Sequence, residues 1–585
     1  MSAVVRERTT RATVDTAGAP RRRFRGKWIV GLVIAAFFGA LLVYPVGSML
    51  VRVFFVDGSF NTDAFVSAWN QTGIATVLLN TLIFVVGTGV VAIGFALVLA
   101  WINERTDARS EVLSRFLGIA PLLLPPIATS IGWVFLLSPG AGFINGILRT
   151  LLGAAGLHLE DGPLNIFTWP GMVLVAGITT MPFAYLPISS ALRNMSPALE
   201  EASTIAGAST FRTFRKVTVP AIAPAMASAA VLVSILTLAL YAVPSIIGTG
   251  AEIEVLAARI VGLLTYSYPP QTDSAVVLGL IVLVVVAIGS FVQNRLLRRG
   301  DFAKVEGKAT HATVVRLGRW RWPARVFTIV FVCCISILPL AAMLIVSLQS
   351  FWSSTVRFDT LTLKSYGEVF GDDPVVADAL VRSVEIAVIG ATVLIIFSLT
   401  MSLFARSSGR VANTLVSWAA AAPGSLSHII VGVAFVVAFS GPPFHLGGTT
   451  LIILLCFIAM YVPQSYFAVS SSVGQLGQDL LDSSAISGAS QARTIRRIII
   501  PLSIGGIVAG WTLTVNMMLS DVTASILLSG TNNAVLGYEI LDLYQNSGYS
   551  RLAALAIVVV LVTAGVFLIG QIIDSRSRKW RSHRA

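Results

Sequence analysis

The polar stretch that decides the fold is Leu199-Glu200-Glu201-Ala202-Ser203-Thr204-Ile205-Ala206-Gly207-Ala208-Ser209, inside an otherwise apolar chain of 585 residues. A second copy follows 281 residues later as Leu480-Leu481-Asp482-Ser483-Ser484-Ala485-Ile486-Ser487-Gly488-Ala489-Ser490. Residues 199–220 are called the first repeated loop and residues 480–501 the second; ten of their 22 aligned positions are identical, without a gap. A repeat in such a fixed register predicts two equivalent halves, each presenting the same polar loop.

Each repeated loop has the pattern of two short helices joined at a glycine. In the first loop, Ser196-Pro197 followed by Glu200 and Glu201 is typical of a helix start, because a hydroxyl caps the first N–H groups and acidic side chains favour the first turn. Gly207 ends this helix, and Ser209 begins a second one with cations three or four residues apart on one face. One such loop is also typical of an interfacial helix with snorkelling cations, but two copies in register favour a dedicated device.

The composition places the chain in a lipid bilayer. Hydrophobic residues make up 55% and charged residues 12% of the chain, and the mean hydropathy is +0.83. Soluble globular proteins carry about 25% charged residues, so this chain is too apolar for that class. Cys333, Cys334 and Cys456 all lie in apolar runs and show no disulfide framework or metal-ligand spacing, which favours a packing role.

Apolar runs long enough to span a bilayer predict twelve membrane helices, six in each half. They lie at 28–51, 74–101, 112–137, 171–192, 225–247, 274–294, 326–350, 380–405, 411–439, 449–471, 503–528 and 552–573. The first run lacks a small-residue cleavage site, so we expect it to remain as an anchor. The expected fold class is an all-α polytopic membrane protein with two parallel six-helix repeats.

The expected domain organisation follows from these runs. It consists of a basic cytoplasmic tail (1–27), a first six-span domain (28–297), a cytoplasmic or interfacial linker (298–325), a second six-span domain (326–574) and a second basic cytoplasmic tail (575–585).

The distribution of cations supports this topology. If both termini are cytoplasmic, the inside segments hold 34 of the 41 Lys and Arg residues, as the positive-inside rule requires. The net charge of +13 is thereby explained by topology, and no nucleic-acid partner is expected. Both repeated loops are then cytoplasmic.

The first repeated loop resembles the EAA loop of permease subunits of type I ATP-binding cassette importers. The resemblance is carried by Glu201-Ala202-Ser203, by Gly207-Ala208 and by Pro220, which lies 19 residues after the acid. The second copy departs from the pattern, because Asp482-Ser483-Ser484 replaces the Glu-Ala-Ala triplet.

The chain as a whole is similar to the fused permeases of the ferric iron and thiamine group. Two EAA-type loops in one chain carry this similarity, and the stretch 133–145 resembles the outer-loop entry of such permeases. The resemblance covers most of residues 28–574, although Gly505 stands where the first half has Pro224. It implies a multi-pass protein of the bacterial inner (plasma) membrane.

The resemblance implies that the two loops are coupling helices that dock into a homodimer of cytoplasmic ATPase subunits, while an extracytoplasmic solute-binding protein delivers the solute. The partner ATPase would bind ATP and Mg²⁺, so no cofactor is expected in this chain. The expected coupling residues are Glu201, Ala202, Gly207, Arg212, Arg215, Pro220, Asp482, Ser483, Gly488, Arg493, Arg496 and Pro501.

Asp521 is the clearest ionisable group inside an expected span, where such groups are costly. It aligns with Leu240 in the first half, and the resemblance implies that the fifth span of each half lines the translocation route and carries the gate. The candidate pathway residues are Tyr241, Pro244, Asp521, Thr523 and Ser525. It remains open whether Asp521 is instead hydrated near the outer face or hydrogen-bonded to a neighbouring Ser or Thr.

Glu385 is the second acid in an expected span, and Arg382, three residues earlier, is its expected partner.

Catalysis within this chain is not expected. The sequence contains no Gly-x-x-x-x-Gly-Lys-[Ser/Thr], no His-Glu-x-x-His, no Cys-x-x-Cys and no Gly-x-Ser-x-Gly. An integral-membrane enzyme therefore has no supporting constellation. An ion-coupled secondary transporter is the alternative transport class, but repeats there are commonly inverted, whereas these are parallel.

The solute is only weakly indicated by the sequence. Ferric iron is the first choice from the resemblance, and thiamine, 2-aminoethylphosphonate and polyamines remain open. No high-affinity metal site is expected in this chain, because no cluster of His, Tyr and carboxylate residues is apparent.

Overall fold

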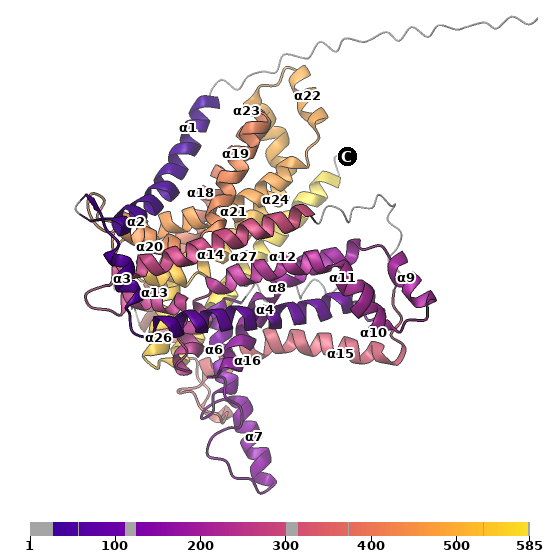
Figure 1. Ribbon diagram of the computed structural model, residues 1–585, viewed down its shortest axis with the longest axis vertical. Helices are drawn as coiled ribbons and strands as arrows, with labels where there is room; N and C mark the ends of the chain where they lie inside the picture. The colour runs from indigo at the N-terminus through magenta and orange to yellow at the C-terminus, as the bar shows by residue number, and fades with distance from the viewer. Residues whose placement is uncertain are drawn as a thin grey trace, which may run out of the picture.

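The computed structural model describes residues 27–56, 58–110, 124–299, 314–372, 374–530 and 532–582. Within these residues the chain is almost wholly helical, and its one sheet is the short antiparallel pair β1 (Phe55–Val56) and β2 (Ser59–Phe60) (Figure 1). Residues 27–299 are called the first half and residues 314–582 the second half. The all-α expectation is confirmed.

The helices follow the same order in both halves. The first half contains α1 (Lys27–Phe38), η1 (Gly39–Val43), α2 (Tyr44–Phe54), α3 (Asp63–Trp69), α4 (Ile74–Arg105), α6 (Pro126–Leu137), α7 (Phe143–Ala154), α8 (Trp169–Asn194), α9 (Ala198–Ile205), α10 (Thr210–Thr213), η2 (Phe214–Thr218), α11 (Val219–Ala221), α12 (Ala223–Leu238), η3 (Pro244–Gly248), α13 (Leu256–Thr265) and α14 (Thr272–Arg299).

The second half repeats this order with a different set of short helices in its outer segments. It contains η5 (Gly318–Trp320), α15 (Arg321–Val332), η6 (Cys333–Ile337), α16 (Leu338–Leu348), η7 (Phe358–Thr360), α17 (Lys364–Gly367), η8 (Glu368–Asp372), α18 (Pro374–Ser407), α19 (Arg410–Ala421), η9 (Ala422–Ser425), α20 (His428–Phe439), α21 (Thr450–Gly474), α22 (Gln478–Ile486), α23 (Gln491–Thr494), η10 (Ile495–Ile499), α24 (Ile500–Leu519), α25 (Thr523–Leu528), α26 (Leu536–Gln545) and α27 (Tyr549–Ser582).

Nine helices in the described residues are long and apolar enough to cross a membrane, and two bent helix pairs bring the number to eleven if each pair is one span. Eleven of the twelve expected spans have such a counterpart. Only α6 represents the remaining one, expected at 112–137, because residues 111–123 lie outside the described residues. Several helices run past the apolar stretch, as α18 does from Pro374 to Ser407, since charged side chains at helix ends extend toward water.

The two halves interlock through their first spans. The helix α2 of the first half packs on α20 of the second, and α16 of the second half packs on α6 of the first. Ring contacts repeat this exchange, with centroids 3.9 Å apart for Phe37 and Phe397 and 4.8 Å apart for Phe95 and Phe331. The main buried core is therefore a continuous cluster that draws residues from both halves.

The fifth spans of the two halves differ in shape. In the first half, residues 210–221 and 223–238 meet at an angle of 68°, whereas residues 491–519 of the second half form one helix without a comparable bend. Pro224 lies at the start of α12 and has no N–H to continue the helical hydrogen bonds, while the second half has Gly505 at this position. The single proline accounts for the difference.

The C-terminal end of the expected linker, from residue 314 onward, packs against the first half. Thr106 and Val315 form a parallel β-bridge, and the N–H of Leu317 donates to Asp107 Oδ1 at 3.0 Å. The start of α15 is thus fixed beside the end of α4. The expected linker residues 300–313 lie outside the described residues.

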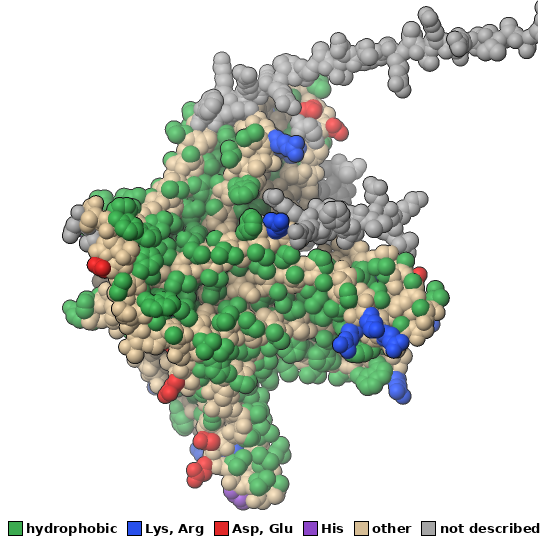
Figure 2. Space-filling model, in the orientation of Figure 1, with side chains coloured by type: hydrophobic (Ala, Val, Ile, Leu, Met, Phe, Trp, Pro, Cys, Tyr) green, Lys and Arg blue, Asp and Glu red, His purple; other side chains and the backbone are tan. Residues whose placement is uncertain are grey.

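The surface has the pattern of a protein in lipid. Hydrophobic side chains cover the broad middle of the face in Figure 2, and most visible Lys and Arg side chains lie toward one end of the long helices. On α4, large apolar side chains are exposed at helical spacing: Leu79, Leu82, Val86 and Val90 are 56%, 61%, 56% and 69% exposed. A stripe of this kind is stable only against an apolar solvent.

Both repeated loops lie at one end of the molecule. In Figure 1, α9 lies at the right and α22 at the top, each at an end of the long helices of its half, and α27 ends between them, whereas α13 and α26 lie at the opposite ends on the left. The helices therefore place the two polar loops on the same side of the expected bilayer.

Candidate functional site

Each repeated loop folds as two short helices joined by a tight turn. In the first loop α9 leads through Gly207 into α10, and in the second α22 leads through Gly488 into α23. Both glycines have a left-handed backbone, with φ of +79° and +75°, and an added Cβ would meet nothing within 4 Å. Backbone conformation, and not lack of space, therefore favours glycine at these positions.

Hydroxyl groups fix the turn in the same way in both loops. Ser209 and Ser490 each accept the N–H of the arginine three residues later at 3.4 Å. The two helices of a loop are joined by hydroxyl pairs 2.8 Å apart, Ser203 with Thr213 and Ser484 with Thr494. The cap expected at Ser209 is present, but Ser196 does not cap α9, whose N-cap is Pro197 without a side-chain hydrogen bond.

Most of the expected coupling residues are accessible at this end of the molecule. Those that are exposed are Glu201, Ala202, Gly207, Arg212, Arg215, Pro220, Asp482, Ser483, Gly488, Arg493 and Arg496, while Pro501 is half-buried. An acidic side chain and two arginines thus surround each turn, which offers a partner both signs of charge.

Two apolar residues that the sequence analysis did not select stand out in these loops. Ile205 and Ile486 occupy the same position in the repeat and are 88% and 84% exposed. Leu199 and Leu480, also a matched pair, are about half exposed. Large apolar side chains exposed in matching places indicate a surface that a partner covers. The sequence signal that could have identified them is that the same residue, isoleucine, occupies this position in both copies of the repeat.

A buried ion pair holds the first loop. The side chain of Arg105, at the end of α4, is 0% exposed, and its Nε lies 3.7 Å from Oε2 of Glu200, which is 7% exposed. Arg105 Nη2 donates to the carbonyl of Met195 at 2.8 Å, and Thr218 Oγ1 donates to Glu200 Oε1 at 2.6 Å. These contacts join the second span, the end of the fourth span and both ends of the loop.

The second loop is held by different chemistry. Arg406 at the end of α18 donates to the carbonyls of Val473 and Leu476, both at 2.7 Å, as Arg105 does to Met195. The positions of Glu200 and Thr218 are taken by Leu481 and Ile499. These two belong to a small apolar cluster that includes Val469 and Val473.

The fifth span of each half is broken at the same place. The helix α12 ends at Leu238 and α24 at Leu519, and residues 239–241 and 520–522 leave the helix in exact correspondence. Helical backbone resumes before Pro244 in the first half and at Thr523 in the second. Broken backbone at membrane depth is tolerated where protein covers it or where it lines a path.

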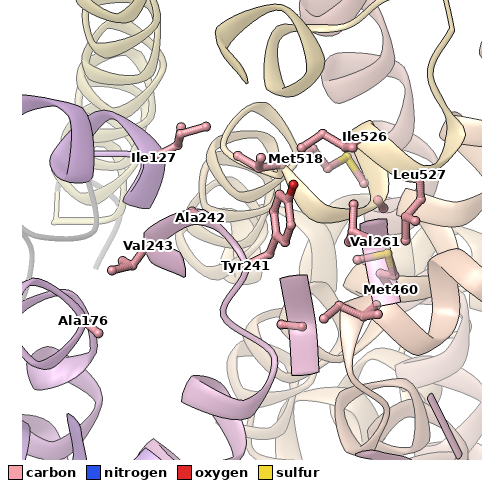
Figure 3. Close-up of a cluster of buried hydrophobic side chains, with 14 of the residues drawn as sticks. Ile127, Ala176, Tyr241, Ala242, Val243, Val261, Met460, Met518, Ile526 and Leu527 are labelled. Carbon is pink, nitrogen blue, oxygen red and sulfur yellow. The ribbon is translucent and has the colours of Figure 1, made fainter. Parts of the chain in front are cut away.

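An apolar cluster from both halves closes over these breaks. Tyr241 of the first half lies among Met518, Ile526 and Val261 in Figure 3, and all four side chains are buried. Pro244 is buried beside it at the start of η3. These apolar contacts make the cluster a seal, and the Tyr241 hydroxyl interacts with the side chains of Tyr266 and Ser245.

Asp521 lies in the break of the second half, and its side chain is 2% exposed. Its Oδ1 accepts the N–H groups of Ala524 at 2.9 Å and Ser525 at 3.3 Å, which caps α25. Its Oδ2 accepts the hydroxyl of Tyr461 at 3.1 Å and lies 3.4 Å from Nδ1 of His428. The Asp521 carboxylate is thus buried, and its partners are two backbone N–H groups, a tyrosine hydroxyl and a histidine, whereas the one Ser hydroxyl bonded to this residue reaches its backbone carbonyl.

The remaining pathway candidates lie on α25 but do not bind this carboxylate through their hydroxyls. Thr523 and Ser525 are buried, and Ser525 Oγ donates to the backbone carbonyl of Asp521 at 2.8 Å. The expected pairing of Glu385 with Arg382 is wrong: Glu385 is exposed, and Arg382 donates to the carbonyl of Ala534 at 2.8 Å.

The cluster of Asp521, Tyr461 and His428 corrects the expectation that no His, Tyr and carboxylate cluster exists. These residues come from α20, from α21 and from the break between α24 and α25, and they are far apart in the sequence, so only the fold brings them together. His428 begins α20 at a bend of 93° after α19, and Tyr461 lies two residues before Pro463 in α21. The described residues contain no group of three or more His, Cys, Asp or Glu that could hold a metal ion.

Two hollows in the described surface lie away from this cluster. One, of about 430 Å³, is apolar and lies between α3 and α14, where Trp69 and Ile281 line it. The other, of about 290 Å³, is lined in part by Lys364, Glu368 and Arg551. Both are formed by segments far along the chain from the repeated loops.

Comparisons with known proteins agree with this organisation. The family described as binding-protein-dependent transport system inner membrane component matches residues 92–300 and 391–579. The ferric transport system permease protein FbpB of Actinobacillus pleuropneumoniae is 24% identical over 582 residues, which are 97% of this chain and 81% of that protein.

Two further relatives differ in how much of the chain they cover. The putative ferric transport system permease protein FbpB 1 of Haemophilus influenzae is 23% identical over 510 residues, 85% of this chain and 77% of that protein. The sulfate transport system permease protein CysW of Escherichia coli is 25% identical over 299 residues, 49% of this chain and 94% of that protein.

Proposed function

The chain belongs to the family of binding-protein-dependent transport system inner membrane components, and on this premise we propose that it is the fused permease subunit of an ATP-binding cassette importer. Two family matches in one chain support the fusion of two permease units. The observation that carries the proposal is the pair of equivalent repeated loops at one end of the molecule, each with an exposed isoleucine. The cation distribution favours the cytoplasm for this end and for both termini.

The partner at the repeated loops is a homodimer of cytoplasmic ATPase subunits, which binds the ATP and Mg²⁺. Each loop exposes one isoleucine, which is Ile205 in the first loop and Ile486 in the second. Beside it lie an acidic residue, Glu201 or Asp482, and several arginines. A homodimer has two identical grooves, so two matching loops suit it better than one. An extracytoplasmic solute-binding protein delivers the solute at the opposite end.

The loops transmit motion because they are continuous with the broken fifth spans. Residues 491–519 form one helix from the second loop to the break at Asp521, a lever of about 43 Å at 1.5 Å per residue. Closure of the ATPase dimer draws the two loops together, and the fifth-span helices move with them. This movement pulls Tyr241 away from the apolar side chains of the second half and opens the seal. In the first half the bend at Ile222 divides this lever into two segments.

Ferric iron is the solute that we propose first. The two relatives that cover most of this chain, 97% and 85%, are named as ferric transport permeases, whereas the sulfate permease covers only 49%. Thiamine, 2-aminoethylphosphonate and polyamines are the alternative cargoes of the same importer class.

The test is reconstitution of the chain in proteoliposomes with the ATPase and binding protein encoded beside it. We expect ATP-dependent accumulation of ⁵⁵Fe when the binding protein carries ferric iron. Ile205→Arg combined with Ile486→Arg removes both exposed isoleucines and should abolish co-purification of the ATPase and uptake together. Val314→Arg is the matched control, because Val314 is 52% exposed beside the end of α4 and lies outside both repeated loops.

Uptake that persists without ATPase and follows an imposed ion gradient would contradict the importer proposal in favour of a secondary transporter. ATP-driven uptake of another solute, with no accumulation of iron, would contradict only the cargo.

A further inference from the structure

We propose that Asp521, Tyr461 and His428 form a transit site for a hard multivalent metal cation at the break of the second fifth span. This inference rests on the proposed function and narrows its cargo to a metal ion. Figure 3 shows the neighbouring seal, with Met460 and Met518, which flank this cluster in the sequence, near Tyr241 of the other half.

The donor set suits such an ion. A carboxylate and a phenolate are hard oxygen donors, and an imidazole accepts iron as well as zinc or copper. All three groups converge on one atom, because Tyr461 Oη and His428 Nδ1 lie 3.1 and 3.4 Å from Asp521 Oδ2. Coordination of the phenol oxygen releases its proton to water, as metal binding to a protonated ligand does.

The fold does not need the carboxylate to make the break. The first half has the same three-residue interruption at residues 239–241, with Leu240 in place of Asp521 and Thr180 in place of Tyr461. The same interruption of the helix therefore forms with a neutral side chain in the first half of the molecule. Ionisable groups are costly inside a membrane, so the presence of Asp521 in this span needs a reason. Binding of the metal cation supplies that reason.

The cluster has an accessible side and a closed side. His428 is 39% exposed while Asp521 is 2% exposed behind it, and the apolar seal of Tyr241, Met518 and Ile526 lies nearby. The interrupted helices α19–α20 and α24–α25 and the proline-containing helix α21 meet here, so a small rearrangement of any of them changes access. Three donors leave coordination positions open on the ion, so that it can exchange ligands and leave again.

The test uses the full complex with its ATPase in nanodiscs and Fe³⁺ added as ferric nitrilotriacetate. Binding at Tyr461 gives a visible tyrosinate-to-iron charge-transfer band, which Tyr461→Phe should remove. Tyr466→Phe is the matched control, because Tyr466 is a buried tyrosine five residues further along α21. Asp521→Asn keeps a side chain that caps α25 and should lower ATP-driven iron uptake about ten-fold or more, with assembly and ATPase docking intact.

The outcomes distinguish failure of the transit site from failure of the ferric importer proposal. If the wild type takes up iron but shows no band, or if Tyr461→Phe and Asp521→Asn both take up iron at the wild-type rate, the transit site is wrong and the importer stands. If the reconstituted wild type carries thiamine or a polyamine and no iron, the ferric cargo and the transit site both fail.

Discussion

Arg105 and Glu200 form an ion pair that is almost completely shielded from solvent, with side chains 0% and 7% exposed and Nε 3.7 Å from Oε2. The pair ties the end of the second span to the first repeated loop. At the matching position of the second loop, Leu481 packs into an apolar cluster. The two proposed coupling loops therefore expose the same helix–turn–helix shape, but a buried ion pair holds the first loop and apolar packing holds the second.

The first prediction concerns this pair. Glu200→Ala leaves Arg105 buried without its carboxylate, and we expect it to destabilise the protein by about 3–5 kcal/mol. Arg105→Met combined with Glu200→Leu removes both charges and should recover most of this loss, since apolar side chains replace a buried pair well. Thermal unfolding in detergent of the wild type, Arg105→Met, Glu200→Leu and their double variant completes the cycle, with Glu200→Ala measured beside them.

Leu481→Ala supplies the comparison in the second half. It should lower stability through lost packing alone, and its effect should add to that of Glu200→Ala, because Leu481 packs in a separate apolar cluster from the Arg105–Glu200 pair. A double variant of Arg105 and Glu200 as unstable as Glu200→Ala would contradict the role given to the pair.

The second prediction concerns the turns at Gly207 and Gly488. Proline fixes φ near −65°, whereas these glycines have φ of +79° and +75°, so Gly207→Pro with Gly488→Pro distorts both turns. We expect solute uptake to be uncoupled from ATP hydrolysis while the membrane helices stay folded, as circular dichroism would report.

The matched control is Gly207→Asn with Gly488→Asn, since asparagine adopts left-handed backbone more readily than other residues. Near-normal uptake in the asparagine variant and loss in the proline variant is the expected contrast. Unchanged uptake in the proline variant would refute the coupling role.

The third prediction concerns the contact between the halves at Gly132. A Cβ there would lie 2.6 Å from Pro339 Cβ and 2.9 Å from its backbone oxygen, so Gly132→Ala should push α6 away from α16. We expect a loss of about 1–3 kcal/mol and a lower Tm. Gly279→Ala in α14 is the control, because its Cβ would meet nothing within 4 Å and alanine favours a helix by about 1 kcal/mol.

The fourth prediction concerns the seal at Tyr241. Tyr241→Ala removes a ring that lies among Met518, Ile526 and Val261, and the resulting hole should let small ions leak across proteoliposomes without ATP. Tyr241→Phe keeps the ring and should stay tight, because the packing and not the hydroxyl closes the path. Equal leak rates for the alanine variant and the wild type would show that the seal lies elsewhere.

The sequence predicts the helical fold well because apolar length and cation placement determine membrane spans almost directly. It also predicts the turns at Gly207 and Gly488, since both depend on neighbours within a few residues. The bend at Ile222 follows from Pro224, whose missing counterpart at Gly505 is visible in the aligned repeat.

The contacts that the sequence does not predict join residues far apart in the chain. Arg105 and Glu200 are 95 positions apart, and His428, Tyr461 and Asp521 come from α20, α21 and the break before α25, so no local pattern indicates them. The cap assigned to Ser196 was wrong because α9 has Pro197 as its N-cap, without a side-chain hydrogen bond. The pair assigned to Glu385 and Arg382 was wrong because a tertiary contact, from Arg382 to the carbonyl of Ala534, takes the guanidinium that short-range spacing had assigned to Glu385.

The central claim, that one ATPase homodimer grips both repeated loops from the same side of the membrane, is tested most directly by site-specific photo-cross-linking. A photoreactive amino acid replaces Ile205 in one variant and Ile486 in another, in the assembled complex within membranes. The account predicts that both positions cross-link to the ATPase subunit and are shielded from membrane-impermeant reagents added outside. Cross-linking at only one of the two positions, or labelling of either from the outside, would contradict it.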